Sequence, residues 1–111
     1  MTLTLDNERL EKDLILSRQS EIRELFDRGK RIKSKYILIY YDKAPAEQVG
    51  FFVQKKSGNS PKRNLYKRWL REIYRRNKSH FTGLKLIFYV HKPLNISYHE
   101  LADDILSLEF K

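Results

Sequence analysis

Residues 55–78 read KKSGNSPKRNLYKRWLREIYRRNK. This segment holds ten lysines and arginines and one acid, Glu72, so its net charge of +9 equals the net charge of the whole chain. The rest of the sequence is therefore close to neutral. A positive charge concentrated in one element is typical of a surface that binds a polyanion.

The same segment predicts a two-faced helix. Ser60 and Pro61 predict its start, because serine caps helices and proline suits the first helical position, and the helix is expected to run to about Asn77. At 100° per residue, the apolar residues form one face, made of Leu65, Tyr66, Trp69, Leu70 and Ile73. The opposite face is polar and cationic and holds Asn64, Lys67, Arg68, Arg71, Arg75 and Lys78.

A cationic helix face has two interpretations, a solvated surface or a binding surface. Here Lys67, Arg71 and Arg75 follow one another at four-residue spacing, where like charges repel by about 0.2–0.5 kcal/mol per pair. Because the single acid, Glu72, falls off this face, the pattern favours anion binding. The preceding loop contains Gly58 and leads to a helix N-terminus, which also suits phosphate.

The flanking segments predict a small α+β fold, an α/β sandwich with the order α-β-β-α-β-α. The predicted strands are residues 35–42, 48–56 and 84–91, and in the second the apolar Val49, Phe51 and Val53 alternate with Gly50, Phe52 and Gln54. Helices are predicted at 20–28, with Ser20 as the cap and Gly29 as the stop, and from Ser97, where Glu100 completes a capping box. We expect one domain over residues 1–111, with 1–16 as a candidate extended arm.

Composition narrows the function. The chain has no cysteine, which excludes disulfides and thiolate metal sites. Its mean hydropathy of −0.66 and the absence of a long apolar run predict a cytoplasmic protein without a membrane partner. A protein nuclease needs clustered carboxylates or paired histidines. The nearest such group is His99, Glu100, Asp103 and Asp104 on the last predicted helix. Glu100 already has a capping role and acids suit the first turns of a helix, so no metal site is predicted. A membrane-surface protein fits less well, because Trp69 lies in the apolar stripe that is expected to face the core. A DNA-binding protein also fits less well, because the basic helix lies between strands and not in a helix-turn-helix.

Residues 50–75, together with Val49 before them, resemble the signature of the bacterial ribonuclease P protein component. A strand with Val49, Gly50 and Val53 leads to Lys55-Lys56, Gly58 and a helix that begins Arg63-Asn64 and continues Lys67-Arg68 and Arg71-Glu72. The resemblance extends over about residues 20–93, and it implies a left-handed βαβ crossover. Two positions depart from the family pattern: Leu65 stands where a third cation is usual, and Ile22 stands where a phenylalanine is usual.

The resemblance implies a protein subunit that assists an RNA catalyst in the endonucleolytic 5′ maturation of tRNA. The RNA subunit would require Mg²⁺, and the protein would bind no cofactor and act as a monomer in the holoenzyme. Its partners would be the ribonuclease P RNA and precursor tRNA. The residues implied to bind the RNA subunit are Lys62, Arg63, Asn64, Lys67, Arg68, Arg71 and Arg75. Those implied to bind the 5′ leader are Ile22, Phe26, Tyr40, Phe52, Gln54 and Lys56. The alternative is a basic RNA-binding or ribosome-associated protein without a nuclease partner.

Overall fold

The computed structural model describes residues 14–110, which form one mixed sheet and three α-helices. Two short 3₁₀ helices flank the long central helix. In chain order the elements are α2 (Gln19–Arg28), β1 (Lys30–Lys33), β2 (Leu38–Lys43), β3 (Gln48–Val53), η2 (Lys55–Ser57), α3 (Ser60–Arg76), η3 (Lys78–Phe81), β4 (Leu84–Val90) and α4 (Tyr98–Leu106).

The strands lie in the order β1-β2-β4-β3. β1 and β2 form an antiparallel hairpin, and β2 pairs antiparallel with β4. β3 and β4 run parallel, and such a pair needs a crossover connection, which α3 supplies. The predicted α+β fold with its βαβ crossover is thus confirmed.

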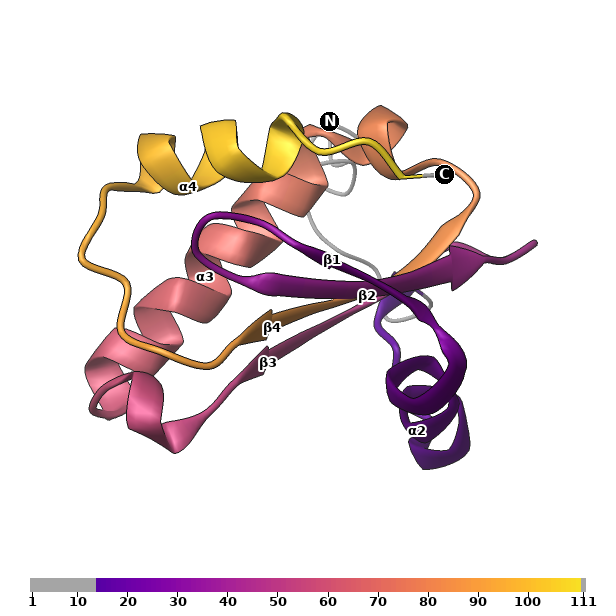
Figure 1. The fold of residues 1–111 in the computed structure, drawn as a ribbon, viewed down its shortest axis with the longest axis horizontal. Coiled ribbons are helices and arrows are strands. Elements are labelled where there is room, and N and C mark those ends of the chain that lie inside the picture. The colour runs from indigo at the N-terminus through magenta and orange to yellow at the C-terminus, as the bar shows by residue number, and fades with distance from the viewer. Residues whose placement is uncertain (1–13, 111) are drawn as a thin grey trace, which may run out of the picture.

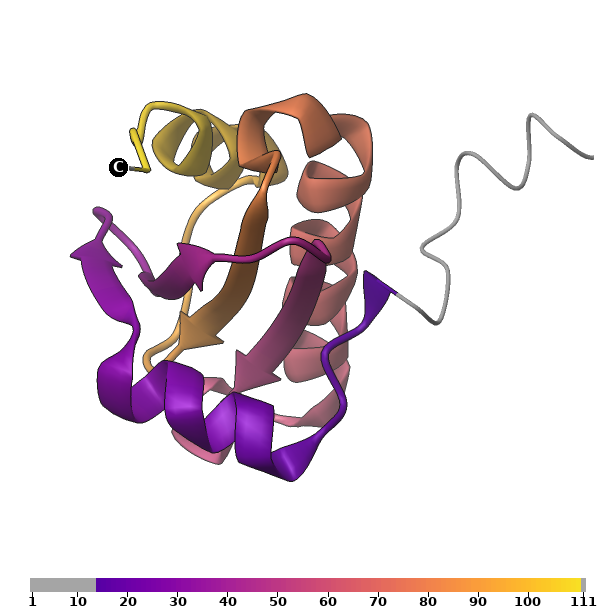
Figure 2. The same cartoon turned by 90° about the vertical axis from the view of Figure 1, so that its right-hand side faces the viewer.

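Helices lie on both sides of the sheet (Figure 1), and the sheet separates two apolar clusters. α3 and α4 cover one face, where alternate strand residues such as Ile39, Val49 and Phe88 are fully buried beneath Leu70 and Leu101. α2 lies on the other face, where Leu25 packs against Ile87. Figure 2 shows α2 in front of the strands and α3 behind them. The strand alternation predicted for residues 48–54 is confirmed, because Val49 and Phe52 belong to opposite clusters.

Strand β1 was missed by the sequence patterns, and two predicted strand boundaries were wrong. The predicted strand 35–42 begins only at Leu38, because the Ser34 N–H donates to the Ile37 carbonyl and closes a turn there. The predicted strand 48–56 ends at Val53, since residues 55–57 form η2. The tight start of η2 takes Lys55 and Lys56 out of the sheet.

Two of the three predicted helix caps were wrong. Ser20 lies inside the first turn of α2, and Arg18 takes the cap position without a side-chain bond. In α3 the cap is Asn59, whose Oδ1 accepts from the Lys62 N–H at 3.0 Å, while Ser60 is the first helical residue. The capping box of Ser97 and Glu100 at the start of α4 is confirmed.

The last part of the candidate arm joins the sheet edge. Ile15 forms a parallel bridge with Val49, and the Leu16 N–H donates to the Val49 carbonyl at 2.8 Å. Leu16 is buried with Leu25 under α2. Residues 1–13 of the candidate arm lie outside the described part of the chain.

Candidate RNA interface

The outer surface of α3 is the first candidate surface. Tyr66, Leu70, Ile73 and Tyr74 point into the core, so the opposite side of the helix is left to solvent. We call the exposed polar residues there the basic face, which consists of Asn64, Lys67, Arg68 and Arg71. Leu65 and Trp69, expected in the core stripe, are only half-buried, and Tyr74 replaces them at the centre of the packing.

Arg71 is positioned by an aromatic ring. Its guanidinium carbon lies 5.8 Å from the centre of the Phe51 ring, a cation–π distance. Phe51 in turn stacks on Phe88 with centroids 5.8 Å apart. Strand β3 therefore holds the Arg71 stem in place while the side chain remains exposed.

The N-terminal end of α3 is shaped by the loop before it. Gly58 has a φ of 153°, which L side chains rarely adopt, and a Cβ there would lie 3.1 Å from the Lys62 Cβ. Ser57 is buried, and its hydroxyl donates to the Val90 carbonyl at 3.2 Å. The loop thus fastens the start of α3 to the end of β4.

Arg63 lies at this same end and is partly buried. Its Nη2 donates to the Ser60 hydroxyl at 3.0 Å. Its Nε is buried and has no hydrogen-bond partner among residues 14–110. Lys62 beside it is exposed. The sequence-predicted Lys62 and Arg63 therefore stand at the loop end of the basic face.

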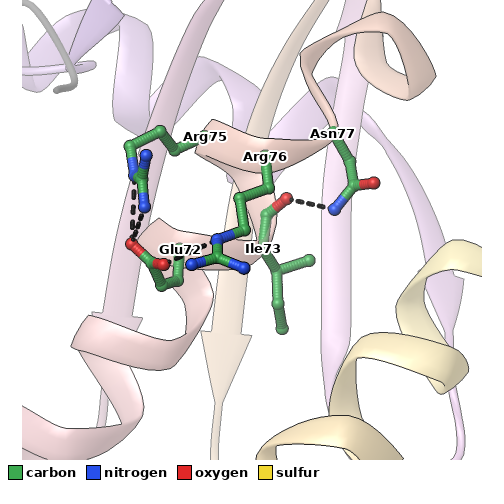
Figure 3. Close-up of polar contacts among 5 residues, drawn as sticks. All are labelled: Glu72, Ile73, Arg75, Arg76 and Asn77. Carbon is green, nitrogen blue, oxygen red and sulfur yellow. Dashed lines mark hydrogen bonds and ion pairs between the residues drawn. The ribbon is translucent and has the colours of Figure 1, made fainter. Parts of the chain in front are cut away.

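Arg75 differs from the other predicted cations, because it is engaged within the protein (Figure 3). Its guanidinium binds the Glu72 carboxylate, and Arg76 Nε contacts the second oxygen of that carboxylate at 2.8 Å. The side chain of Arg75 is only 16% exposed, against 63% for Arg76. The hydrogen bond from Arg75 keeps the pKa of Glu72 below its ordinary value, so the carboxylate stays charged.

The second candidate surface lies on the α2 side of the sheet. Phe26 of α2 stands at its centre, with its ring centroid 4.8 Å from Tyr40, 5.7 Å from Phe52 and 5.8 Å from Tyr89. All three contacts are edge-to-face, which is the favoured geometry for aromatic pairs. We call this half-buried group, together with Ile22, the aromatic face.

The sheet register explains how the aromatic face is assembled. Phe52 pairs with Tyr89, and Gly50 pairs with Ile87. A Cβ on Gly50 would lie 2.9 Å from the Phe52 ring, closer than real side chains approach. The glycine therefore makes room for the Phe52 ring to lie over the strand, where it meets Phe26.

Basic groups border the aromatic face. Lys33 pairs with Leu38, which pairs with Tyr89, so these three residues form one row across the sheet. His91 stacks on Tyr89 with centroids 6.1 Å apart. Burial, followed by the charges of Lys92, Lys56 and Lys33, lowers the pKa of His91. The positive charge at this border therefore comes from the lysines and not from His91.

The two predicted site groups fall on two surfaces. All residues of the predicted RNA-subunit group lie on α3. Four of the six leader residues, Ile22, Phe26, Tyr40 and Phe52, come together on the aromatic face. Gln54 and Lys56 are exposed beyond the end of β3. Sequence reasoning missed Tyr89, Lys33 and His91. For Tyr89 and His91 a signal existed, because they alternate with the core residues of β4, whereas Lys33 lies in the unrecognised strand β1.

The acidic group on α4 serves the fold. Glu100 closes the capping box, and the Asp104 carboxylate accepts from the N–H groups of Lys35 and Tyr36 at 3.1 and 3.3 Å. Within residues 14–110, no three histidine, cysteine or acidic side chains gather as metal ligands. No helix in that range combines the length and apolar character needed to cross a bilayer.

Comparison with known proteins agrees with this geometry. Residues 10–110 match the family model described as Ribonuclease P. The chain is 30% identical to the ribonuclease P protein component of Petrotoga mobilis over 94% of this chain and 95% of that protein. It is 33% identical to the component from Finegoldia magna over 87% of this chain and 88% of that protein.

Solved structures share the fold. The RNase P protein of Thermotoga maritima superposes with a TM-score of 0.75 at 26% identity, over 83% of this chain and 94% of that one. The protein from Staphylococcus aureus superposes with a TM-score of 0.76 at 20% identity, over 85% of this chain and 90% of that one. From its sequence and its fold, the chain belongs to the ribonuclease P protein component family, the protein side of a tRNA-processing ribonucleoprotein.

Proposed function

We propose that this chain binds the catalytic RNA of a ribonuclease P through the basic face and the 5′ leader of precursor tRNA through the aromatic face. Hydrolysis of the phosphodiester is assigned to the RNA subunit and its Mg²⁺. The observation that carries the proposal is the presence of two chemically different surfaces on opposite sides of one sheet, a cationic one on α3 and an aromatic one beside α2.

The basic face suits the backbone of a structured RNA. Guanidinium groups bind phosphate oxygens in a two-pronged geometry, and Arg68 and Arg71 present theirs to solvent. Asn64 and Lys67 extend the same face by one turn toward the loop. Such contacts fix position on the RNA and bring salt dependence with them.

The aromatic face suits an unpaired strand. Bases of single-stranded RNA stack on aromatic rings for about 1–3 kcal/mol each, with little dependence on sequence. The bordering Lys33 and Lys56 supply charge for the phosphates between those bases. A leader is present in precursor tRNA and absent from the mature product, so such a surface raises affinity for the substrate alone.

Reconstitution with a bacterial ribonuclease P RNA tests the proposal. The protein is expected to stimulate precursor tRNA cleavage at low Mg²⁺, where RNA–RNA contacts are weakest. Replacing Arg68 and Arg71 by alanine should reduce the log–log salt slope of RNA binding by about one unit per lost contact.

Two outcomes would contradict the assignment. A protein that binds RNA but does not stimulate cleavage would be a general RNA-binding or ribosome-associated protein. Cleavage by the protein in the absence of the RNA subunit would show that the protein, and not the RNA, hydrolyses the phosphodiester.

A further inference from the structure

A groove between α3 and α4 borders the basic face, with which it shares Arg68, and lies apart from the aromatic face. It is open to solvent and has a volume of about 440 Å³, within the range of about 300–1,000 Å³ that small-molecule sites occupy. Its lining is entirely aromatic or ionisable and consists of Arg68, Trp69, Glu72, Arg76, Tyr98 and His99.

The wall of the groove is a pair of half-buried rings. Trp69 and Tyr98 meet with centroids 6.3 Å apart and planes at 71°. Behind them Tyr66 contacts Trp69 at 5.9 Å, and the Tyr66 hydroxyl donates to the buried Leu94 carbonyl. The capping box at Ser97 fixes the start of α4 directly before Tyr98. Both rings are therefore held from behind and remain partly exposed in front.

The rim of the groove is cationic. The Arg68 side chain is exposed and forms no ion pair or hydrogen bond with any residue in 14–110. Arg76 is 63% exposed while it contacts Glu72. The one carboxylate of the groove is already held by Arg75 and Arg76, so it presents little uncompensated negative charge.

These features select one kind of occupant. An apolar peptide needs aliphatic or ring-filling pockets, and the groove lining includes no aliphatic side chain. A nucleobase offers a flat π surface for the rings, and its phosphate offers an anion for a guanidinium. Arg68 also belongs to the basic face, so an RNA strand along α3 passes the mouth of the groove.

We propose that the α3–α4 groove binds one unpaired nucleotide of an RNA strand, with the base against Trp69 and Tyr98 and the phosphate at Arg68. The inference rests on the proposed function for its RNA partner, and it adds a single-strand contact separate from the aromatic face. The contact would hold a nucleotide bulged from the RNA that lies on the basic face.

Trp69 provides a direct test, because it is the only tryptophan in the chain. Titration with hexauridylate RNA is expected to quench Trp69 emission and to shield the ring from acrylamide. Inorganic polyphosphate of similar charge is the control, since it can bind the cations but has no base to stack. Equal effects of the two polyanions, or no effect of the RNA, would overturn the inference, and this measurement needs no variant.

A matched pair of variants tests the contact from the other side. Tyr98→Ala removes one wall of the groove and should weaken, on the order of tenfold, the hexauridylate binding that Trp69 emission reports. Tyr36→Ala removes another half-buried tyrosine ring outside the groove and should leave binding unchanged. Equal losses in two variants shown by circular dichroism to be folded would refute the assignment.

The inference and the proposed function fail separately. A protein that stimulates precursor tRNA cleavage but whose Trp69 emission does not respond to RNA would remove the groove and retain the subunit role. A protein whose emission is quenched by RNA and not by polyphosphate, but which gives no stimulation, would retain the groove and remove the subunit role.

Discussion

Single residues decide how much charge α3 presents. Glu72 is the only acid in the helix, and its carboxylate is shared by Arg75 and Arg76. Two of the cations counted in the sequence are therefore partly neutralised in the fold. The charge available to a partner is concentrated on Lys67, Arg68 and Arg71.

Glu72→Gln should strengthen RNA binding. The substitution removes the carboxylate that engages Arg75 and Arg76, so the log–log salt slope should steepen by about one unit. Binding titrations at several salt concentrations measure this slope. Asp103→Asn changes the net charge equally on the exposed side of α4 and serves as the control. Equal slopes in the two variants would mean that net charge alone, and not release of the arginines, determines the effect.

Tyr74 should make the protein sensitive to alkali. Burial, with a contribution from the charge of Glu47, raises the pKa of Tyr74 from 10.0 to about 12. Below pH 10 the Tyr74 hydroxyl is protonated in both the folded and the unfolded state, so the free energy of unfolding has its full value. As the pH rises toward 12, only the unfolded state releases this proton, and the free energy of unfolding falls. Urea unfolding between pH 9 and about 11.5 should show a smaller decline in Tyr74→Phe than in the unaltered chain. Parallel pH profiles for the two proteins would contradict this origin.

Elements are placed by local signals, and α3 shows which of those signals act. Its start was predicted from Ser60-Pro61, yet the capping bond comes from Asn59. Asparagine and serine are about equally good caps, so residue type alone does not choose between Asn59 and Ser60. In the fold the backbone of Asn59 is extended and Ser60 is already helical, and this difference is a property of the folded chain.

Asn59→Ala should therefore destabilise the protein and Ser60→Ala should not. Loss of the bond from the Lys62 N–H is expected to cost about 1 kcal/mol. Ser60→Ala removes only the acceptor for Arg63 Nη2 on the exposed surface, so a change within about 0.5 kcal/mol is expected. Chemical denaturation of both variants compares the two free energies of unfolding. A larger loss for Ser60→Ala would restore the sequence-based cap.

The elements with a clear hydrophobic periodicity were predicted correctly, and the strand without one was missed. The alternation in residues 48–53 and 84–90 and the amphipathic period of α3 were read correctly, because burial on one side dictates them. Strand β1 reads KRIK and has one apolar residue, so nothing local marks it as a strand. It is a strand because it pairs with β2, and this pairing is not visible in the sequence of β1 alone.

At the scale of the whole molecule, the sheet keeps the two candidate surfaces apart. α3 and α4 occupy one side, and α2 with the aromatic face occupies the other. Substitutions on one surface should therefore be nearly independent of those on the other, since they share no contacts.

Phe52→Ala should weaken precursor tRNA binding by the reconstituted enzyme by about 5- to 100-fold, with little change for mature tRNA. The reason is that the ring on the aromatic face would stack on the leader, which mature tRNA lacks. Phe51→Ala is the matched control, because it removes the same ring from the opposite face of the same strand. It can loosen Arg71 on the basic face, but it should leave the ratio of precursor to mature tRNA affinity unchanged. Equal losses for precursor and mature tRNA would reduce Phe52 to a packing role.

Site residues that lie together on one helix were predictable from the sequence. Those that meet across several elements were harder to predict. Lys67, Arg68 and Arg71 follow from one helical wheel. Tyr89 could be assigned to the correct strand face, but its place beside Phe52 depends on a parallel register between strands far apart in the chain. The pairing of Trp69 with Tyr98 likewise depends on how α4 returns across α3.

The strand order has a consequence for how the protein is made. β4 is the last strand to be synthesised, yet it lies between β2 and β3 and bonds to both. Until residue 90 has left the ribosome, the two earlier strands have no shared neighbour and their inner edges stay unpaired. The nascent chain must therefore keep these two strand edges unpaired until β4 has emerged and the sheet can close.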